Sequence, residues 1–171
     1  MSAKAGKLSV GEDERVVYED GKPVKVILSG REVPLVPVKG RMHVDITVGG
    51  EFVETIESKS LDFIWSRKNP DVVGFFLDVT YEKGYLRISG DELETGKAYA
   101  ISDALTEVNI RFKLEGIQTP ESFNPVGTLT IREATENSID GQMSFSFKGS
   151  VQDGGKETNF RCNAFSLNIA D

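Results

Sequence analysis

The sequence predicts an all-β domain, either an antiparallel two-sheet β-sandwich or a closed β-barrel. Between Val126 and Ile169, apolar and polar residues alternate with a period of two, as around Met143, Phe145 and Phe147. That period buries one face of a strand and leaves the other in water. The same alternation recurs upstream, and 17 glycines suit many tight turns. We expect about a dozen short strands, because even spacing with glycine-rich turns is typical of sandwiches and barrels alike.

The length and composition suit one domain with a substantial core. Of 171 residues, 39% are hydrophobic, too many for a disordered chain at this net charge. We expect a flexible tail over residues 1–14 and a hairpin or meander over residues 15–40, which is either an appended unit or part of the domain. The main β domain is expected over residues 41–171.

The first strands are predicted from turn signals. Residues 16–18 and 24–28 flank Asp20-Gly21 and form a hairpin. Residues 32–38 contain two prolines, each of which lacks a backbone donor, so this segment is expected at a sheet edge or in an extended linker. Gly49-Gly50 then predicts a second tight hairpin.

Residues 58–69 interrupt the alternation. Leu61, Ile64 and Trp65 are at helical spacing, and an Asn-Pro pair follows. This pattern predicts at most one short helix near residues 58–69. Clean alternation then resumes and predicts strands near residues 73–81, 86–88, 99–101, 108–114, 129–131, 139–151 and 160–169.

The last strand changes its apolar phase. Its apolar residues occupy even positions up to Ala164 and odd positions from Phe165. A slip of one residue sends every later side chain to the opposite face. We therefore expect either a β-bulge at this point or a strand that crosses from one sheet to another.

The charge balance restricts the partners. Lys and Arg total 20 against 27 Asp and Glu, a net charge of −7, so nucleic-acid binding by phosphate neutralisation is not expected. An acidic surface serves solubility or steers a basic partner. Neither a transmembrane run nor the apolar core of a signal peptide is found, so no membrane contact is expected. We expect a cytoplasmic protein, or an exported one if an export signal had been removed.

Catalytic, metal and cofactor patterns are not found, and no cofactor is expected. His43, near Asp45, is either a general base or an ordinary surface histidine. Cys162 is the only cysteine, so no internal disulfide forms. Its apolar neighbours favour a buried side chain over a nucleophile. Residues 90–97 resemble a phosphate-binding loop but have the wrong glycine spacing and several carboxylates.

The aromatic and basic segment around the only tryptophan is one candidate binding surface. Phe63, Trp65, Arg67 and Lys68 lie where the strand pattern lapses, and Trp and Arg are favoured at binding hot spots. The alternative is that Trp65 closes one end of the core. Phe76 follows an inward-facing neighbour and therefore meets solvent, a second sheet or a partner.

The charged segment Asp91, Glu92 and Glu94 is the other candidate contact surface. We expect a non-enzymatic, acidic interaction domain that binds a protein partner and acts as an inhibitor, an immunity-type protein or an assembly component. If the acidic surface serves to steer that partner, the partner is basic. The alternative is a closed, calycin-like β-barrel that holds a small apolar ligand, which the strand count and the ten phenylalanines suit. A hydrolase with carboxylates assembled by the fold is a third reading. The sequence leaves the oligomeric state open.

Overall fold

The structure, a computed structural model, describes residues 6–7, 14–20, 22–28, 31–65, 72–102, 107–120, 123–149 and 154–169. These residues form strands and turns only, so they include no helix that could cross a membrane. In chain order, the strands are β1 (Gly6–Lys7), β2 (Glu14–Glu19), β3 (Lys22–Leu28), β4 (Arg31–Pro34), β5 (Val36–Arg41), β6 (Val44–Val48), β7 (Glu51–Ile56), β8 (Ser58–Trp65), β9 (Val72–Val73), β10 (Phe75–Tyr81), β11 (Gly84–Gly90), β12 (Ala98–Ile101), β13 (Val108–Leu114), β14 (Val126–Ala134), β15 (Ser138–Lys148) and β16 (Glu157–Asn168).

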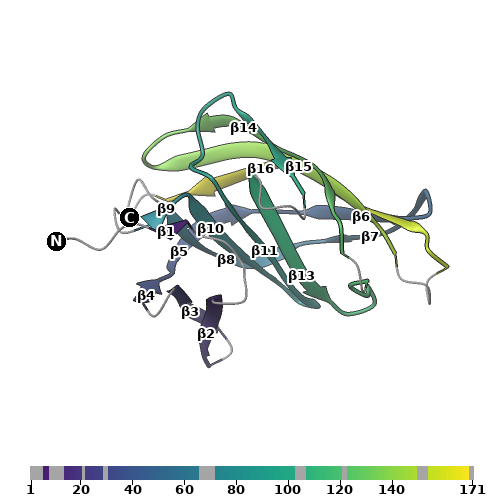
Figure 1. The fold of residues 1–171 in the computed structure, drawn as a ribbon, viewed down its shortest axis with the longest axis horizontal. Helices are drawn as coiled ribbons and strands as arrows, with labels where there is room; N and C mark the ends of the chain where they lie inside the picture. Colours follow the sequence, from purple (N-terminus) through teal and green to yellow (C-terminus); the bar gives the residue numbers. More distant parts are fainter. Residues whose placement is uncertain are drawn as a thin grey trace.

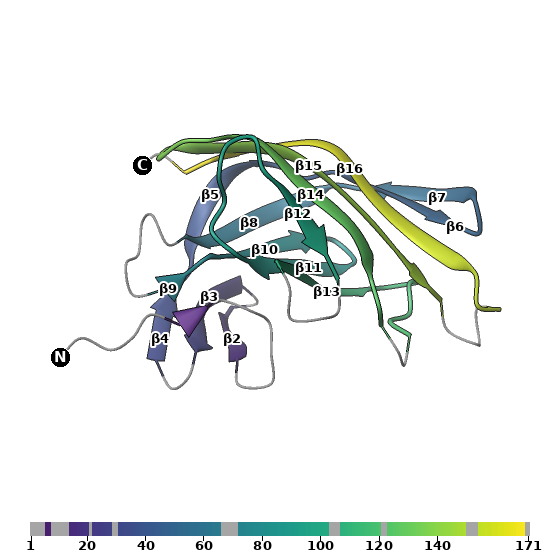
Figure 2. The same ribbon diagram turned by 45° about the horizontal axis from the view of Figure 1, so that its top comes forward.

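The main body is a closed barrel of nine strands (Figures 1 and 2). Its order is β15-β14-β12-β13-β11-β10-β8-β5-β16, and pairing between β15 and β16 closes the ring. The fold is therefore the barrel that the sequence left as an alternative, and not the two-sheet sandwich. Strand alternation is the same in both architectures, so the pattern could not distinguish them.

The expected phase change in β16 is confirmed as a bulge. Gly141 pairs with Phe165, but Met143 pairs with Cys162, so β16 carries one extra residue between these pairs. The bulge lies where β16 changes neighbours: its first half pairs with β6 and its end pairs with β5. The extra residue turns Phe165 and Leu167 back into the barrel, where both are buried.

The predicted helix is wrong over the residues described. Residues 58–65 form strand β8, and the remaining residues of the prediction, 66–69, lie outside the described residues. Phe63 and Trp65 point into the barrel, whereas Ile64 packs on its outer side. Burial on both faces replaces alternation with a continuous apolar run, which resembles a buried helix in sequence.

A small sheet of β2, β3 and β4 covers part of the outer wall of the barrel. The expected turn lies between β2 and β3, where Asp20 has a φ of 52°. Val26, Val33 and Leu35 pack here against Ile64 of β8 and Phe76 of β10. Pro34 is on the edge strand β4, and the chain enters the barrel at β5.

The barrel interior is filled by side chains. The buried apolar residues of the barrel form one continuous cluster. Five phenylalanines with ring centroids 4.9–6.3 Å apart occupy part of it: Phe112, Phe123, Phe145, Phe147 and Phe160. The enclosed space beside Leu93 and Phe165 has a volume of only about 10 Å³. The phenylalanines thus pack against one another as part of the core.

Candidate functional site: the acidic end of the barrel

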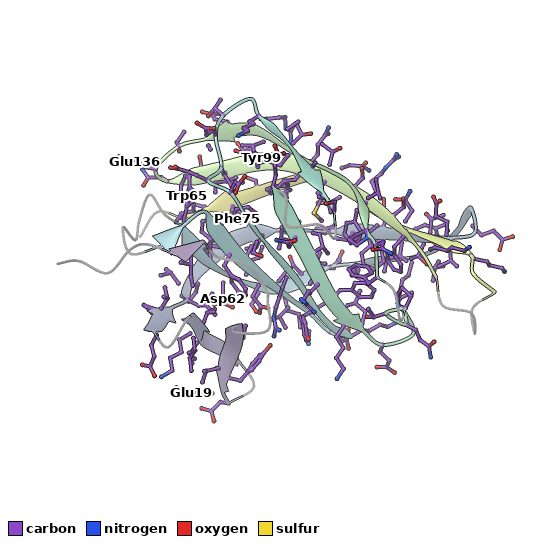
Figure 3. The ribbon with its side chains drawn as sticks, viewed as in Figure 1. Glu19, Asp62, Trp65, Phe75, Tyr99 and Glu136 are labelled. Atoms are coloured by element: carbon purple, nitrogen blue, oxygen red, sulfur yellow. The ribbon has the colours of Figure 1, made fainter. Side chains whose placement is uncertain are left out.

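The aromatic candidates lie inside the molecule. Phe63 and Trp65 are 2% and 1% exposed and belong to the barrel core. Their rings lie 6.0 Å apart, and Figure 3 shows Trp65 close to Phe75. Direct contact with a partner would require the barrel end to open. Arg67 and Lys68 lie outside the described residues.

Phe76 faces the second sheet, one of the alternatives that the sequence offered. The ring is 1% exposed and is covered by the apolar side chains of the small N-terminal sheet. Its burial follows from packing within the chain. Phe76 is therefore not exposed for a partner either.

The acidic candidates are at the surface and are held in place. Glu92 and Glu94 are exposed, and Leu93 between them is buried among the side chains that close this end of the barrel. The hydroxyl of Tyr99 donates to the Glu92 carbonyl at 2.7 Å and accepts from the Glu94 amide at 2.8 Å. The loop backbone is thus fixed by a buried side chain and a tyrosine beneath it.

Hydrogen bonds join this loop to the β14–β15 hairpin. Thr95 Oγ1 donates to the Ala134 carbonyl at 3.1 Å and accepts from the Ala134 amide at 2.9 Å. The hairpin carries exposed Glu133 and Glu136, and Figure 3 shows Glu136 on the same side of the molecule as Tyr99. The Asp91 amide donates to the Glu107 carbonyl at 2.9 Å. We call the group Asp91, Glu92, Glu94, Glu107, Glu133 and Glu136 the acidic end.

The charges affect Tyr99 and Lys97. Burial raises the pKa of Tyr99, and the hydrogen bond from the backbone amide of Glu94 opposes that rise. The nearby carboxylates of Glu94, Asp91 and Glu107 raise the pKa further. Lys97 lies 3.6 Å from a Glu94 carboxylate oxygen and 4.9 Å from the centre of the Tyr99 ring. Lys97 is thus engaged within its own loop, with Glu94 and the Tyr99 ring.

Sequence reasoning found half of this surface. Asp91, Glu92 and Glu94 are close in the chain, so their charges stand out as a run. Glu107, Glu133 and Glu136 join them only through the pairing of β12, β13 and β14. No local signal marks such residues, because strand order sets their proximity.

The surroundings of His43 and Cys162, the two candidate catalytic side chains, do not favour catalysis. His43 Nδ1 lies 3.7 Å from a Glu57 carboxylate oxygen on the outer wall. Cys162 is 1% exposed, and burial raises the pKa of its thiol to about 11. A thiol that ionises so late is a poor nucleophile at neutral pH. Within the described ranges, no group of three His, Cys, Asp or Glu side chains is placed to hold a metal ion.

Comparison with known proteins gives no relative. No protein family model matches the chain, and neither the curated proteins nor the solved structures give a significant match.

Proposed function

We propose that this chain is a non-enzymatic interaction domain that binds a basic protein partner through the acidic end. The observation that carries the proposal is the fixed geometry of the loop over residues 91–97. Leu93 anchors it in the core, Tyr99 holds its backbone, and Thr95 joins it to the neighbouring hairpin. A surface that is ordered before binding loses less entropy on association.

The state of the barrel interior favours a protein partner over a small apolar ligand. Ligand cavities usually enclose about 300–1,000 Å³. The enclosed space beside Leu93 and Phe165 measures about 10 Å³, which is about the least that one water molecule requires. An apolar ligand would have to displace core side chains, whereas a protein partner needs only the existing surface.

Charge would act mainly on the rate of association. Exposed carboxylates steer an oppositely charged partner and raise the association rate, while they add modestly to affinity. Such a surface suits an inhibitor, an immunity-type protein or an assembly component, each of which acts by occupying a surface of its partner.

Charge-neutral variants of the full chain test the proposal. Asp91→Asn, Glu92→Gln and Glu94→Gln are combined in one variant, and the wild type and variant are each used for affinity capture from the native host with quantitative mass spectrometry. A basic protein enriched by the wild type should be recovered about tenfold less with the variant. Its association with the purified chain should slow as salt is added.

A matched variant separates this site from overall charge. Glu51→Gln, Glu115→Gln and Glu157→Gln remove the same net charge from exposed positions on other elements. This variant should retain capture. Equal losses in both variants, or enrichment of no basic protein by the wild type, would overturn the proposal.

A further inference from the structure

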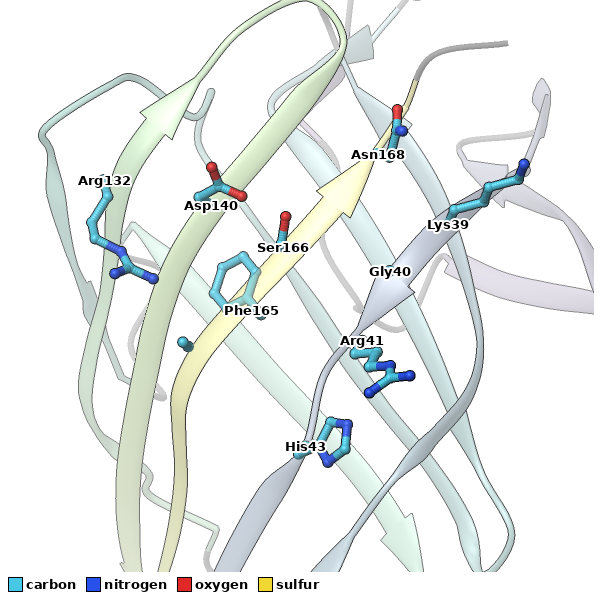
Figure 4. Close-up of a pocket in the computed structure, with 10 residues that line it drawn as sticks. Lys39, Gly40, Arg41, His43, Arg132, Asp140, Phe165, Ser166 and Asn168 are labelled. Atoms are coloured by element: carbon cyan, nitrogen blue, oxygen red, sulfur yellow. The ribbon is translucent and has the colours of Figure 1, made fainter.

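A second surface of opposite charge lies on the outer wall of the barrel. An open groove of about 680 Å³ crosses β14, β15, β16 and β5 (Figure 4). Figure 4 shows Arg132 at one side and Lys39, Arg41 and His43 at the other, with Ser166 between them. The groove does not include any residue of the acidic end as defined above.

The groove exists because its floor is made of small residues. Gly40, Ala164 and Ser166 lie between longer side chains. A Cβ on Gly40 would stand 2.2 Å from the Ser166 carbonyl oxygen, so only glycine allows β5 to approach β16 here. The bulge of β16 brings Ala164 to the surface at this point. Bulges often re-aim side chains next to binding sites.

The rim is cationic in a chain whose net charge is −7. Lys39, Arg41 and Arg132 are exposed, and none of them forms an ion pair with another residue that the structure describes. Asp140 is the one carboxylate among the described residues that line the groove. Glu133, which shares the β14 bulge with Arg132, does not line the groove.

Strand register gives the spacing between the cations. Asp140 pairs with Ser166, and Ser166 pairs with Arg41, so these residues form one row across the outer wall. Arg132 lies at the other end of the row, in the β14 bulge opposite Asp140. Three strand spacings separate β14 from β5, about 14 Å, which an extended chain covers in about four residues.

We propose that this groove binds an extended acidic segment of a protein, with carboxylates four residues apart. Residues i and i+4 of an extended chain point to the same side, so one carboxylate meets Arg132 and the other meets Arg41 and Lys39. The residue at i+2 faces Asp140 and Ser166. A hydroxyl donor suits that position, and a third carboxylate there is repelled by Asp140.

Fluorescence anisotropy with the full chain and labelled synthetic peptides tests the proposal. The probe is a ten-residue peptide with aspartates at its third and seventh positions and serine and threonine elsewhere. A peptide of the same composition with adjacent aspartates is the spacing control. We expect saturable binding of the probe, at least about fivefold weaker binding of the control, and weakening of both by salt.

Protein variants locate the binding. The double variant Arg41→Gln, Arg132→Gln should weaken binding of the probe about tenfold. The matched double variant Lys113→Gln, Lys148→Gln, at exposed positions elsewhere, should change the affinity for the probe less than about twofold. Ser166→Leu fills the floor without changing charge and should also weaken binding. Asp140→Asn should strengthen binding about twofold. Unchanged thermal midpoints confirm that these surface variants fold.

Several outcomes would overturn the proposal. These are no saturable binding, no dependence on aspartate spacing, or equal losses in the groove variant and its matched control. Tripolyphosphate binding with the same response to every variant would instead indicate a general anion site. A second copy of this chain could also occupy the groove, and analytical sedimentation tests this. If the wild type self-associates and the Arg41→Gln, Arg132→Gln variant does not, the groove binds a second copy instead of an acidic segment.

Discussion

The barrel interior and the seam under the N-terminal sheet are two buried regions built on different principles. The interior is one apolar cluster built from the strands of the main sheet. The seam, which we define by Ile64, Phe76, Asp78 and Arg87 on the barrel and the small sheet above them, combines apolar and charged side chains. Both regions are buried, but among the described residues only the seam has a carboxylate with no exposed surface, that of Asp78.

The seam is polar because it uses the outer faces of β10 and β11. Alternation along β10 places Phe76 and Asp78 on that face, and both are covered. Arg87 Nε donates to Asp78 Oδ1 at 2.9 Å, its guanidinium lies 3.9 Å from the centre of the Tyr85 ring, and it also donates to Tyr18 of β2. The interior should therefore respond most to lost volume, and the seam to lost charge pairing.

The largest effect is expected in the interior. Phe160→Ala should lower the free energy of unfolding by about 3–5 kcal/mol, through lost transfer energy and a residual cavity. The ring is 0% exposed, and its centroid lies 4.9 Å from that of Phe145. Urea denaturation measures the loss. Phe52→Ala, at a ring that is 66% exposed, is the control and should cost no more than about 0.5 kcal/mol.

At the seam, removal of one charge should cost nearly as much. Arg87→Leu leaves the Asp78 carboxylate buried without its cation, and we expect a loss of about 3 kcal/mol in urea denaturation. The double variant Asp78→Leu, Arg87→Leu should recover most of that loss, because it removes both buried charges. Additive losses would show that the two side chains are not coupled, and that the seam behaves like the interior.

The seam should also give stability a particular pH dependence. Burial raises the pKa of Asp78, and its hydrogen bond and attraction to Arg87 reduce that rise without cancelling it. Between the ordinary pKa of 3.8 and the raised folded value, the folded protein binds a proton that the unfolded chain has released. This difference in proton binding therefore stabilises the fold at low pH, and the stabilisation is lost as the pH rises from 3.8 to the raised pKa of the folded state.

Asp78→Asn lacks this titration, so its stability relative to the wild type should improve as pH increases from 3.5 to 7. Parallel urea denaturation series across that range measure the difference, in which the other carboxylates cancel. A constant difference, or one that changes in the opposite direction, would show that Arg87 keeps the folded pKa of Asp78 at or below its ordinary value.

The same contrast explains which parts of the fold could be predicted from sequence. Strands with one wet face, such as β13 and β15, alternate without interruption and were predicted correctly. β8 was predicted as a helix because the core covers Phe63 and the N-terminal sheet covers Ile64. Closure of the barrel depends on pairing of β15 with β16 and leaves no mark on the alternation of either strand.

Of the two candidate binding surfaces, only part of the acidic end could be predicted from the sequence. The run of carboxylates at residues 91–94 is a local feature, so it could be found in the sequence. The cationic groove could not, because Arg132 and Arg41 are distant in the chain and come to line one groove only through the register of β14, β15, β16 and β5. Its small floor residues are also unremarkable until strand pairing aligns them.

Alkylation of Cys162 tests directly whether solvent reaches the barrel interior, and it needs the smallest perturbation of the protein. At pH 8, a thiol of pKa about 11 is ionised in roughly one molecule in a thousand, against roughly one in ten for an unfolded chain with the ordinary value near 9. Iodoacetamide should thus label the native protein at least about 100-fold more slowly than the denatured protein, and burial slows it further. The native rate should rise about tenfold per pH unit up to the pKa, provided that the fold persists.

A Cys162→Ser, Ser166→Cys variant places the thiol at an exposed position of the same strand and should be labelled rapidly in the native state. Native labelling of Cys162 within tenfold of the denatured rate would show that solvent reaches the barrel interior, and would remove the contrast with the seam.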